Sequence, residues 1–373
     1  MTTPSGDWKA VRVVHLTGGC RAINGLDPNV KFEPDALNGK KAAFVTRAYG
    51  AIFSDLETLK LELIGTDFYS HNLELKGIHP PNWRPYHRFP RTVWPSEDEA
   101  QRWSQIGHAA FSRTNGRLWD VASRISHQLR VCGWRLRQVS ESYYDQLGAK
   151  VGGGDFNLGT RFVDGYTWLA YLSIQAYLVD ACVLRDYLAE YYALILRPDN
   201  ELLGKNPITS MGGLLKRKVL NNIGSEDLVA NALREATSEG GWLHELGAYR
   251  DLVVHSAPLA KAQGHMFAVA TEVHLGTTGA LPAIRLPIPA NPLGIAKART
   301  TGEHFENFAR QFELFVQASQ GDAPSSDGMA YAHSALGRLT LLASQLADRS
   351  PVPPEMPLFD ETNIIGPVKV THV

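Results

Sequence analysis

Hydrophobic residues recur at helical spacing through the middle of the chain. Two series of apolar or aromatic positions alternate at steps of four and three residues. The first consists of Leu118, Ala122, Ile125, Leu129, Cys132, Leu136, Val139 and Tyr143, and the second of Ala170, Ile174, Tyr177, Ala181, Leu184, Leu188, Tyr191 and Ile195. This alternation is typical of helices that pack lengthwise on one another. Because only a short glycine-rich stretch at residues 152–154 separates them, we expect the two helices to pack antiparallel.

Shorter helical patterns flank this pair. The first long helix is expected to open at Ser96 and run to about residue 146, with a break at Asn115 and Gly116. Further helices are predicted over residues 160–197, 209–217, 225–237, 241–255, 303–319 and 328–347.

The two ends of the chain show other patterns. Residues 266–273 and 283–286 alternate between apolar and polar positions and predict a β-hairpin around residues 276–279. Near the N-terminus, residues 11–16 favour a short strand, residues 40–63 have helical spacing, and residues 77–95 form a loop rich in Pro and Trp. The prolines after residue 350 predict an extended or disordered tail.

These patterns together predict a mainly α protein: an antiparallel helical bundle with a small C-terminal β-hairpin and flanking helices. The expected divisions are a mixed N-terminal segment over 1–96, the bundle over 97–260, the hairpin and last helices over 261–349, and the Pro-rich tail over 350–373.

Composition narrows the class. With 44% apolar and 20% charged residues, the 373-residue chain can bury a large core. We expect a soluble cytoplasmic protein, because no charged and apolar signal segment opens the chain and no run of about 20 apolar residues predicts a membrane span. The three cysteines are far apart and form no C-x-x-C pair, so neither a metal site nor a disulfide framework is expected. We also expect no cofactor.

One stretch carries candidate chemistry. Within Ala248–His255, Arg250 is followed by Asp251 and, five positions on, by His255. A histidine is a base near neutral pH and an arginine is a permanent cation for phosphate. Asp251 lies one helical turn before His255 and is expected to orient its imidazole. The alternative is structural: Arg250 makes a buried ion pair that fixes helix packing, and His255 faces water.

This helix, among long antiparallel helices, resembles the HEPN superfamily. The family signature is an Arg, a polar residue after it and a His a few positions further, which would correspond to Arg250, Asp251 and His255. The resemblance covers about residues 115–260. It implies a metal-independent endoribonuclease in which attack of the RNA 2′-hydroxyl leaves a 2′,3′-cyclic phosphate. It also implies a homodimer, of the kind used as toxins or phage-defence effectors, with an antitoxin or another regulatory protein as partner. The alternative is a non-catalytic module that binds a nucleotide, RNA or a regulatory protein.

Other charged residues are candidate substrate contacts. Asp180 falls close to the second apolar seam and is expected either to pair with Arg250 or to be solvated. Residues 101–150 hold eight basic and three acidic residues, although the net charge of the chain is −1. If one helix continues across Asn115, an arginine stripe could follow RNA phosphates, although a solvated, ion-paired face is the commoner arrangement. The stripe consists of Arg102, Arg113, Arg117, Arg124 and Arg135. His244 shares a face with His255 but has no third ligand in register, which argues against metal.

Overall fold

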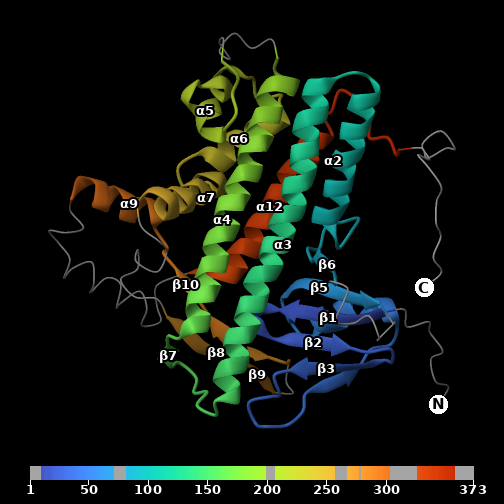
Figure 1. The fold of residues 1–373 in the computed structure, drawn as a ribbon, viewed down its shortest axis with the longest axis vertical. Coiled ribbons are helices and arrows are strands. Elements are labelled where there is room, and N and C mark those ends of the chain that lie inside the picture. The colour runs from blue at the N-terminus through green and yellow to red at the C-terminus, as the bar shows by residue number, and fades with distance from the viewer. Residues whose placement is uncertain are drawn as a thin grey trace, which may run out of the picture.

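The computed structural model combines an N-terminal antiparallel sheet with a group of long helices (Figure 1). It describes residues 10–70, 81–198, 206–256, 267–276, 279–302 and 326–357. The helix predicted over 303–319 and the tail from residue 358 lie outside these residues.

Six short strands of the N-terminal segment form one sheet in the order β4-β3-β2-β1-β5-β6, with every neighbouring pair antiparallel. The strands are β1 (Ala10–Leu16), β2 (Arg21–Asn24), β3 (Asn29–Glu33), β4 (Ala43–Val45), β5 (Leu63–Ser70) and β6 (Asn82–Pro85), with α1 (Ile52–Thr58) between β4 and β5. The strand predicted at residues 11–16 is therefore confirmed. The helix predicted over 40–63 is wrong except for α1.

Two long helices form the backbone of the fold. Helices α3 (Gly116–Gly152) and α4 (Gly165–Tyr191) run side by side (Figure 1). Side-chain contacts join Arg124 to Glu190, Arg135 to Asp180, and Ser142 to Ser173. Because one series ascends while the other descends, the helices are antiparallel, as predicted. All members of both apolar seams are buried except Ile195, which is partly buried.

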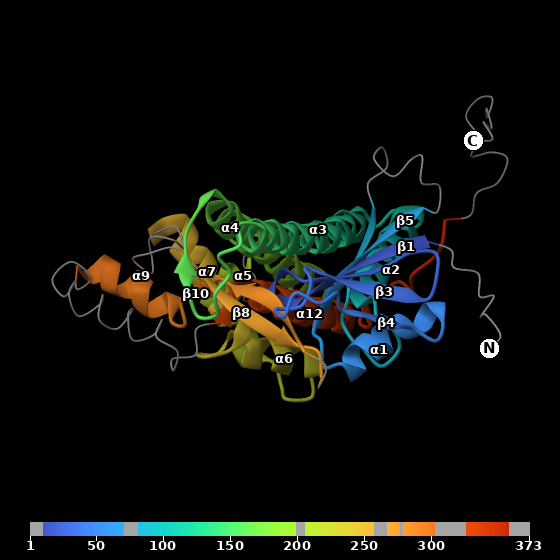
Figure 2. The same cartoon turned by 90° about the horizontal axis from the view of Figure 1, so that it is seen from below.

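Helix α3 is about 55 Å long at 1.5 Å per residue, and different elements cover its two halves. Helix α2 (Pro95–Ser112) packs on the N-terminal half, where Ser126 Oγ donates to the Ala100 carbonyl. The six-stranded sheet packs on the C-terminal half (Figures 1 and 2). Gly19, before β2, has a positive φ of 88°, and a Cβ there would lie 2.7 Å from the Tyr143 carbonyl oxygen. This glycine lets the sheet approach α3 closely.

Smaller elements follow α4. A π-helical turn (Tyr192–Leu196) ends α4, and it is followed by α5 (Met211–Lys216), α6 (Leu228–Thr237), α7 (Trp242–Asp251) and α9 (Pro292–Thr301). Strands β7 (Arg161–Phe162), β8 (Ala268–His274) and β9 (Ala280–Arg285) form a second sheet, which contains the predicted hairpin. Strands β10 (Pro287–Ile288) and β11 (Ser326–Asp327) pair beside the start of α12 (Gly328–Ala347), a buried core helix.

Among the helices of the described residues, only α4 together with its π turn is long and apolar enough by composition to span a membrane. Half of its most apolar window is buried inside the fold, because α3 and α12 pack against it. These contacts make α4 part of the packed core.

The predicted fold class is wrong. The protein is a mixture of α and β structure, with a six-stranded antiparallel sheet and two smaller sheets, and not a helical bundle with one hairpin. The sheet as a whole escaped prediction because buried polar residues interrupt the apolar alternation of its strands. Arg21 and Asn24 are buried in β2, and even β1, the one strand that was predicted, buries Arg12 and His15.

Candidate functional site

The predicted motif lies at the end of α7 and in the π-helical turn that follows it, Leu252–Ser256. Leu246 and Tyr249 are fully buried and anchor α7 to the rest of the fold. The Leu246 carbonyl accepts a contact from Cys182 of α4, and the Tyr249 hydroxyl donates to the Pro289 carbonyl at 2.5 Å. These contacts hold the helix in place while its last turn faces outward.

Arg250, Asp251 and His255 lie together at the surface. Arg250 Nη1 is 2.9 Å from Asp251 Oδ1 and 3.1 Å from His255 Nε2. The Arg250 side chain is 38% exposed and that of Asp251 62% exposed. Because a guanidinium can only donate hydrogen bonds, this contact makes His255 Nε2 the acceptor.

The π-helical turn explains how residues five apart meet. In an α-helix, 100° per residue would place Arg250 and His255 about 140° apart around the axis. A π-helix closes i to i+5, and such turns are often found at functional sites. The wider turn therefore brings His255 to the side from which Arg250 projects.

Asp251 has a different role from the one predicted. Among the described residues, no hydrogen bond joins Asp251 to His255, so the prediction that it orients the imidazole is wrong. Its carboxylate pairs with Arg250 instead, and that hydrogen bond is the largest cause that raises the pKa of the Arg250 guanidinium.

A second guanidinium lies close by. Arg185 of α4 crosses α7 at Gly247, where a Cβ would stand 2.4 Å from its Nη1. Arg185 also contacts Asp186 at 3.2 Å. The missing side chain at Gly247 thus leaves room for a second cation one helical turn before Arg250.

The predicted substrate contacts lie elsewhere. Asp180 does not pair with Arg250: Arg135 Nε donates to it at 2.6 Å, and Gln128 contacts it as well. Arg124 binds both Asp120 and Glu190. Arg117 is exposed, and the described part of the chain offers it no ion pair.

The proposed arginine stripe is also wrong in its premise. The chain turns at Thr114, with φ 56°, and Asn115 caps a new helix. Arg102 therefore lies on α2, which runs antiparallel to α3, and Arg113 is the residue that follows α2. They pair with Asp348 and Glu355, respectively.

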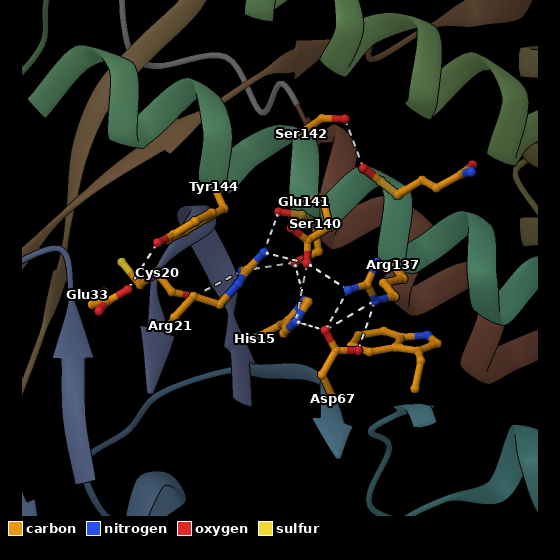
Figure 3. Close-up of polar contacts among 12 residues, drawn as sticks. His15, Cys20, Arg21, Glu33, Asp67, Arg137, Ser140, Glu141, Ser142 and Tyr144 are labelled. Atoms are coloured by element: carbon orange, nitrogen blue, oxygen red, sulfur yellow. Dashed lines mark hydrogen bonds and ion pairs between the residues drawn. The ribbon is translucent and has the colours of Figure 1, made fainter. Parts of the chain in front are cut away.

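A second cluster was missed by sequence reasoning. His15 of β1, Arg21 of β2 and Asp67 of β5 meet Arg137 and Glu141 of α3 beneath the N-terminal sheet (Figure 3). Arg137 donates to both carboxylate oxygens of Asp67, from Nε at 2.8 and 3.2 Å and from Nη2 at 2.7 Å. Arg21 Nη2 donates to the Ser140 carbonyl at 2.9 Å and lies 3.7 Å from Glu141. Only the i, i+4 spacing of Arg137 and Glu141 is visible in the sequence.

The electrostatics of this cluster favour a neutral histidine between paired charges. Burial, followed by the charge of Arg21, lowers the pKa of His15 to about 3. Burial alone would raise the pKa of Asp67, but hydrogen bonds from His15 and Arg137 outweigh it and hold this pKa at about 2. His15 Nε2 therefore donates to Asp67 at 3.2 Å, and Nδ1 accepts from Ser140 at 3.1 Å.

These atoms fit a metal poorly. Donor atoms of His15, Asp67 and Glu141 lie within 4.8 Å of one another, a spacing that an ion could bridge. However, both ring nitrogens of His15 are already engaged, and two arginines balance the two carboxylates, so a cation would add uncompensated charge. His15 is also fully buried, out of reach of a substrate. The cluster is a structural connection between sheet and helix.

Comparisons with known proteins leave the family open, because the chain significantly matches no protein-family model, no curated protein and no solved structure.

Proposed function

We propose that the chain is a metal-independent endoribonuclease of the cytoplasm whose site is Arg250, Asp251 and His255. The single observation that supports the proposal is the 3.1 Å contact between the Arg250 guanidinium and His255 Nε2 at an exposed surface. The structural alternative, in which Arg250 makes a buried ion pair and His255 faces water, would have enclosed the guanidinium inside the chain, whereas the Arg250 side chain is 38% exposed. The HEPN resemblance of the motif is consistent with this proposal.

The chemistry uses the nucleophile that RNA itself provides. The 2′-oxygen attacks the adjacent phosphorus, the bond from phosphorus to the 5′-oxygen breaks, and a 2′,3′-cyclic phosphate and a 5′-hydroxyl remain. His255 Nε2, an acceptor in its contact with Arg250, takes the proton of the 2′-hydroxyl, or in its protonated form supplies one to the leaving oxygen. Arg250 stabilises charge on the pentacoordinate phosphorus, and Asp251 holds the guanidinium in position.

A homodimer would place two such sites together. Helix α4 exposes Trp168, Leu169 and Leu172, each more than half exposed. At 100° per residue, Leu172 shares its side of α4 with Asp186, which lies beside Arg185 near the site. A second copy of this chain is the proposed partner that covers these apolar side chains, because the motif of one chain has a single histidine for two proton transfers.

The activity is tested with purified protein and single-stranded RNA in EDTA, with the product ends analysed by mass spectrometry. We expect 2′,3′-cyclic phosphate ends from the wild type and at least about a 100-fold lower rate for His255→Ala and for Arg250→Ala. His244→Ala, on the same helix, and Arg349→Ala are matched controls that keep full activity. The same oligonucleotide made of DNA should stay intact. Equal cleavage by all variants, or none by the wild type, would contradict the proposal.

The dimer is tested separately by light scattering after size exclusion. Leu172→Asp should convert a dimer to a monomer, and Leu341→Asp, at an exposed position of α12, should not. A monomeric wild type would contradict the dimer but not the catalytic assignment.

A further inference from the structure

A cleft of about 330 Å³ lies between α7, β11 and α12. This volume is within the range of small-molecule sites. Its lining residues are Trp242, Glu245, Ser326, Asp327, Ala330, Tyr331, Ser334, Ala335 and Arg338. Glu245 and Arg250 are about 140° apart around α7, so the cleft is distinct from the proposed catalytic site.

Several polar side chains in this cleft have no hydrogen-bond partner among the residues that the structure describes. Within the described part of the chain, the side chains of Trp242, Glu245, Tyr331, Ser334 and Arg338 make no hydrogen bond or ion pair. Asp327 is the contrast: it accepts from the Tyr143 hydroxyl and from backbone amides of Leu286, Met329 and Ala330. Ser334 and Arg338 are exposed to water, whereas Trp242, Glu245 and Tyr331 are partly buried. Partly buried polar groups without a partner that line a cavity of this size are typical of a site completed by a ligand.

The environment of Glu245 favours a positively charged group in the ligand. Its carboxylate is partly buried, and burial raises its pKa, while the charge of Arg338 lowers it to a lesser extent. The two groups are nevertheless too far apart for an ion pair, since no N–O distance within 4.0 Å joins them. A partly desolvated carboxylate without a partner is unfavourable, and an ammonium group would relieve that cost.

The surroundings of Glu245 favour the same type of group. Trp242 and Tyr331 line the cleft, and aromatic faces attract ammonium groups. The Tyr331 ring is held edge-on by Tyr249, with ring centroids 4.8 Å apart.

Arg338 favours a negatively charged group in the same ligand. Its exposed guanidinium, at the rim of the cleft, is suited to a carboxylate. We propose that this cleft binds a free α-amino acid, with the ammonium group at Glu245 and the carboxylate at Arg338. A polyamine would place positive charge beside Arg338, and an inorganic or nucleotide phosphate would place negative charge beside Glu245. A zwitterion meets both charges.

The proposal is tested by isothermal titration calorimetry of the full chain. The probes are the common L-amino acids, phenethylamine, which is phenylalanine without its carboxylate, and hydrocinnamate, which is phenylalanine without its ammonium group. Spermidine and GMP test the purely cationic ligand and the nucleotide. We expect at least one amino acid to bind one site per chain with a Kd below about 1 mM, and each of the other four probes to bind at least about tenfold more weakly.

Variants locate the site. Glu245→Gln and Arg338→Ala should each weaken amino-acid binding at least about tenfold, and Glu239→Gln and Arg349→Ala, at exposed positions outside the cleft, should leave it unchanged. Because both cleft side chains are at least partly exposed, the variants should fold, which thermal melting checks. Three results would overturn the proposal: no amino acid binds at millimolar concentration, the cleft variants bind as the wild type does, or an amine or nucleotide binds as tightly as the best amino acid.

Discussion

Asp67→Asn removes one charge from the cluster that joins the N-terminal sheet to α3. The Asp67 carboxylate is buried and accepts hydrogen bonds from Arg137 and His15. In the variant, Arg21 and Arg137 share only Glu141, which is 34% exposed. The substitution keeps the size of the side chain, so the expected loss is electrostatic.

The magnitude follows from two considerations. Removal of one partner from a buried ion pair typically costs about 3–5 kcal/mol. The pKa of Asp67 falls from 3.8 to about 2 on folding, which corresponds to about 2 kcal/mol of the free energy of unfolding. Because the folded-state pKa is depressed, this part is fully present above pH 3.8 and is lost as the pH falls toward 2.

We expect Asp67→Asn to lower the free energy of unfolding by at least about 3 kcal/mol at pH 7, measured by urea denaturation with far-UV circular dichroism. The difference from the wild type should shrink by about 2 kcal/mol between pH 5 and pH 2. Asp120→Asn, in an exposed pair with Arg124, is the matched control and should cost less than about 1 kcal/mol. If both variants lose the same small amount, the cluster does not stabilise the contact between sheet and helix.

Three further predictions concern the N-terminal segment and its contacts with the helices. Gly19→Ala should lower the free energy of unfolding by about 3 kcal/mol, because φ is positive there and the new Cβ would lie 2.7 Å from the Tyr143 carbonyl oxygen. Gly39→Ala is the control: φ is 74° and the space around it is open, so it should cost about 1 kcal/mol. Equal urea midpoints for the two variants would refute the close approach of sheet and helix. The free energy of unfolding should fall as the pH drops below about 6.5, because the unfolded chain takes up protons on His15 and His87, whose pKa values are lowered to about 3 in the fold. His15→Gln should reduce the slope of the free energy of unfolding against pH by up to about 1.4 kcal/mol per pH unit. An unchanged slope would mean that His15 is not buried as a neutral group. Zinc or EDTA should leave the melting temperature unchanged, since arginines already balance the carboxylates around His15, and a clear rise with zinc would establish a metal site there instead.

The long helices were predictable because their signal is local and repeated. Each seam, from Leu118 to Tyr143 and from Ala170 to Tyr191, requires only that one side of a helix be apolar. The sheet was not predictable in the same way. In β1 and β2 the buried positions include His15 and Arg21. Both contact Ser140 of α3, more than a hundred residues away, and His15 also contacts Asp67 of β5.

The candidate site also has one part that the sequence predicts and one part that depends on the fold. Arg250, Asp251 and His255 are neighbours in the chain, so the motif could be recognised without coordinates. The way they pair depends on the π-helical turn, which brings Arg250 to His255 rather than Asp251 to His255. Asp180 could be expected to need a partner, but whether that partner was Arg250 or Arg135 depended on the packing of α3 against α4.

The sequence by itself determined the antiparallel helix pair, the C-terminal hairpin and the position of the Arg–Asp–His motif, because these depend on periodicity and short spacing. Only the tertiary structure decided which charged groups share one environment: the buried cluster of His15, Asp67 and Glu141, and the cleft that Glu245 and Arg338 line without forming an ion pair. The physical reason is that burial and charge pairing depend on distances through space, and residues far apart in the chain leave no periodic signal of those distances.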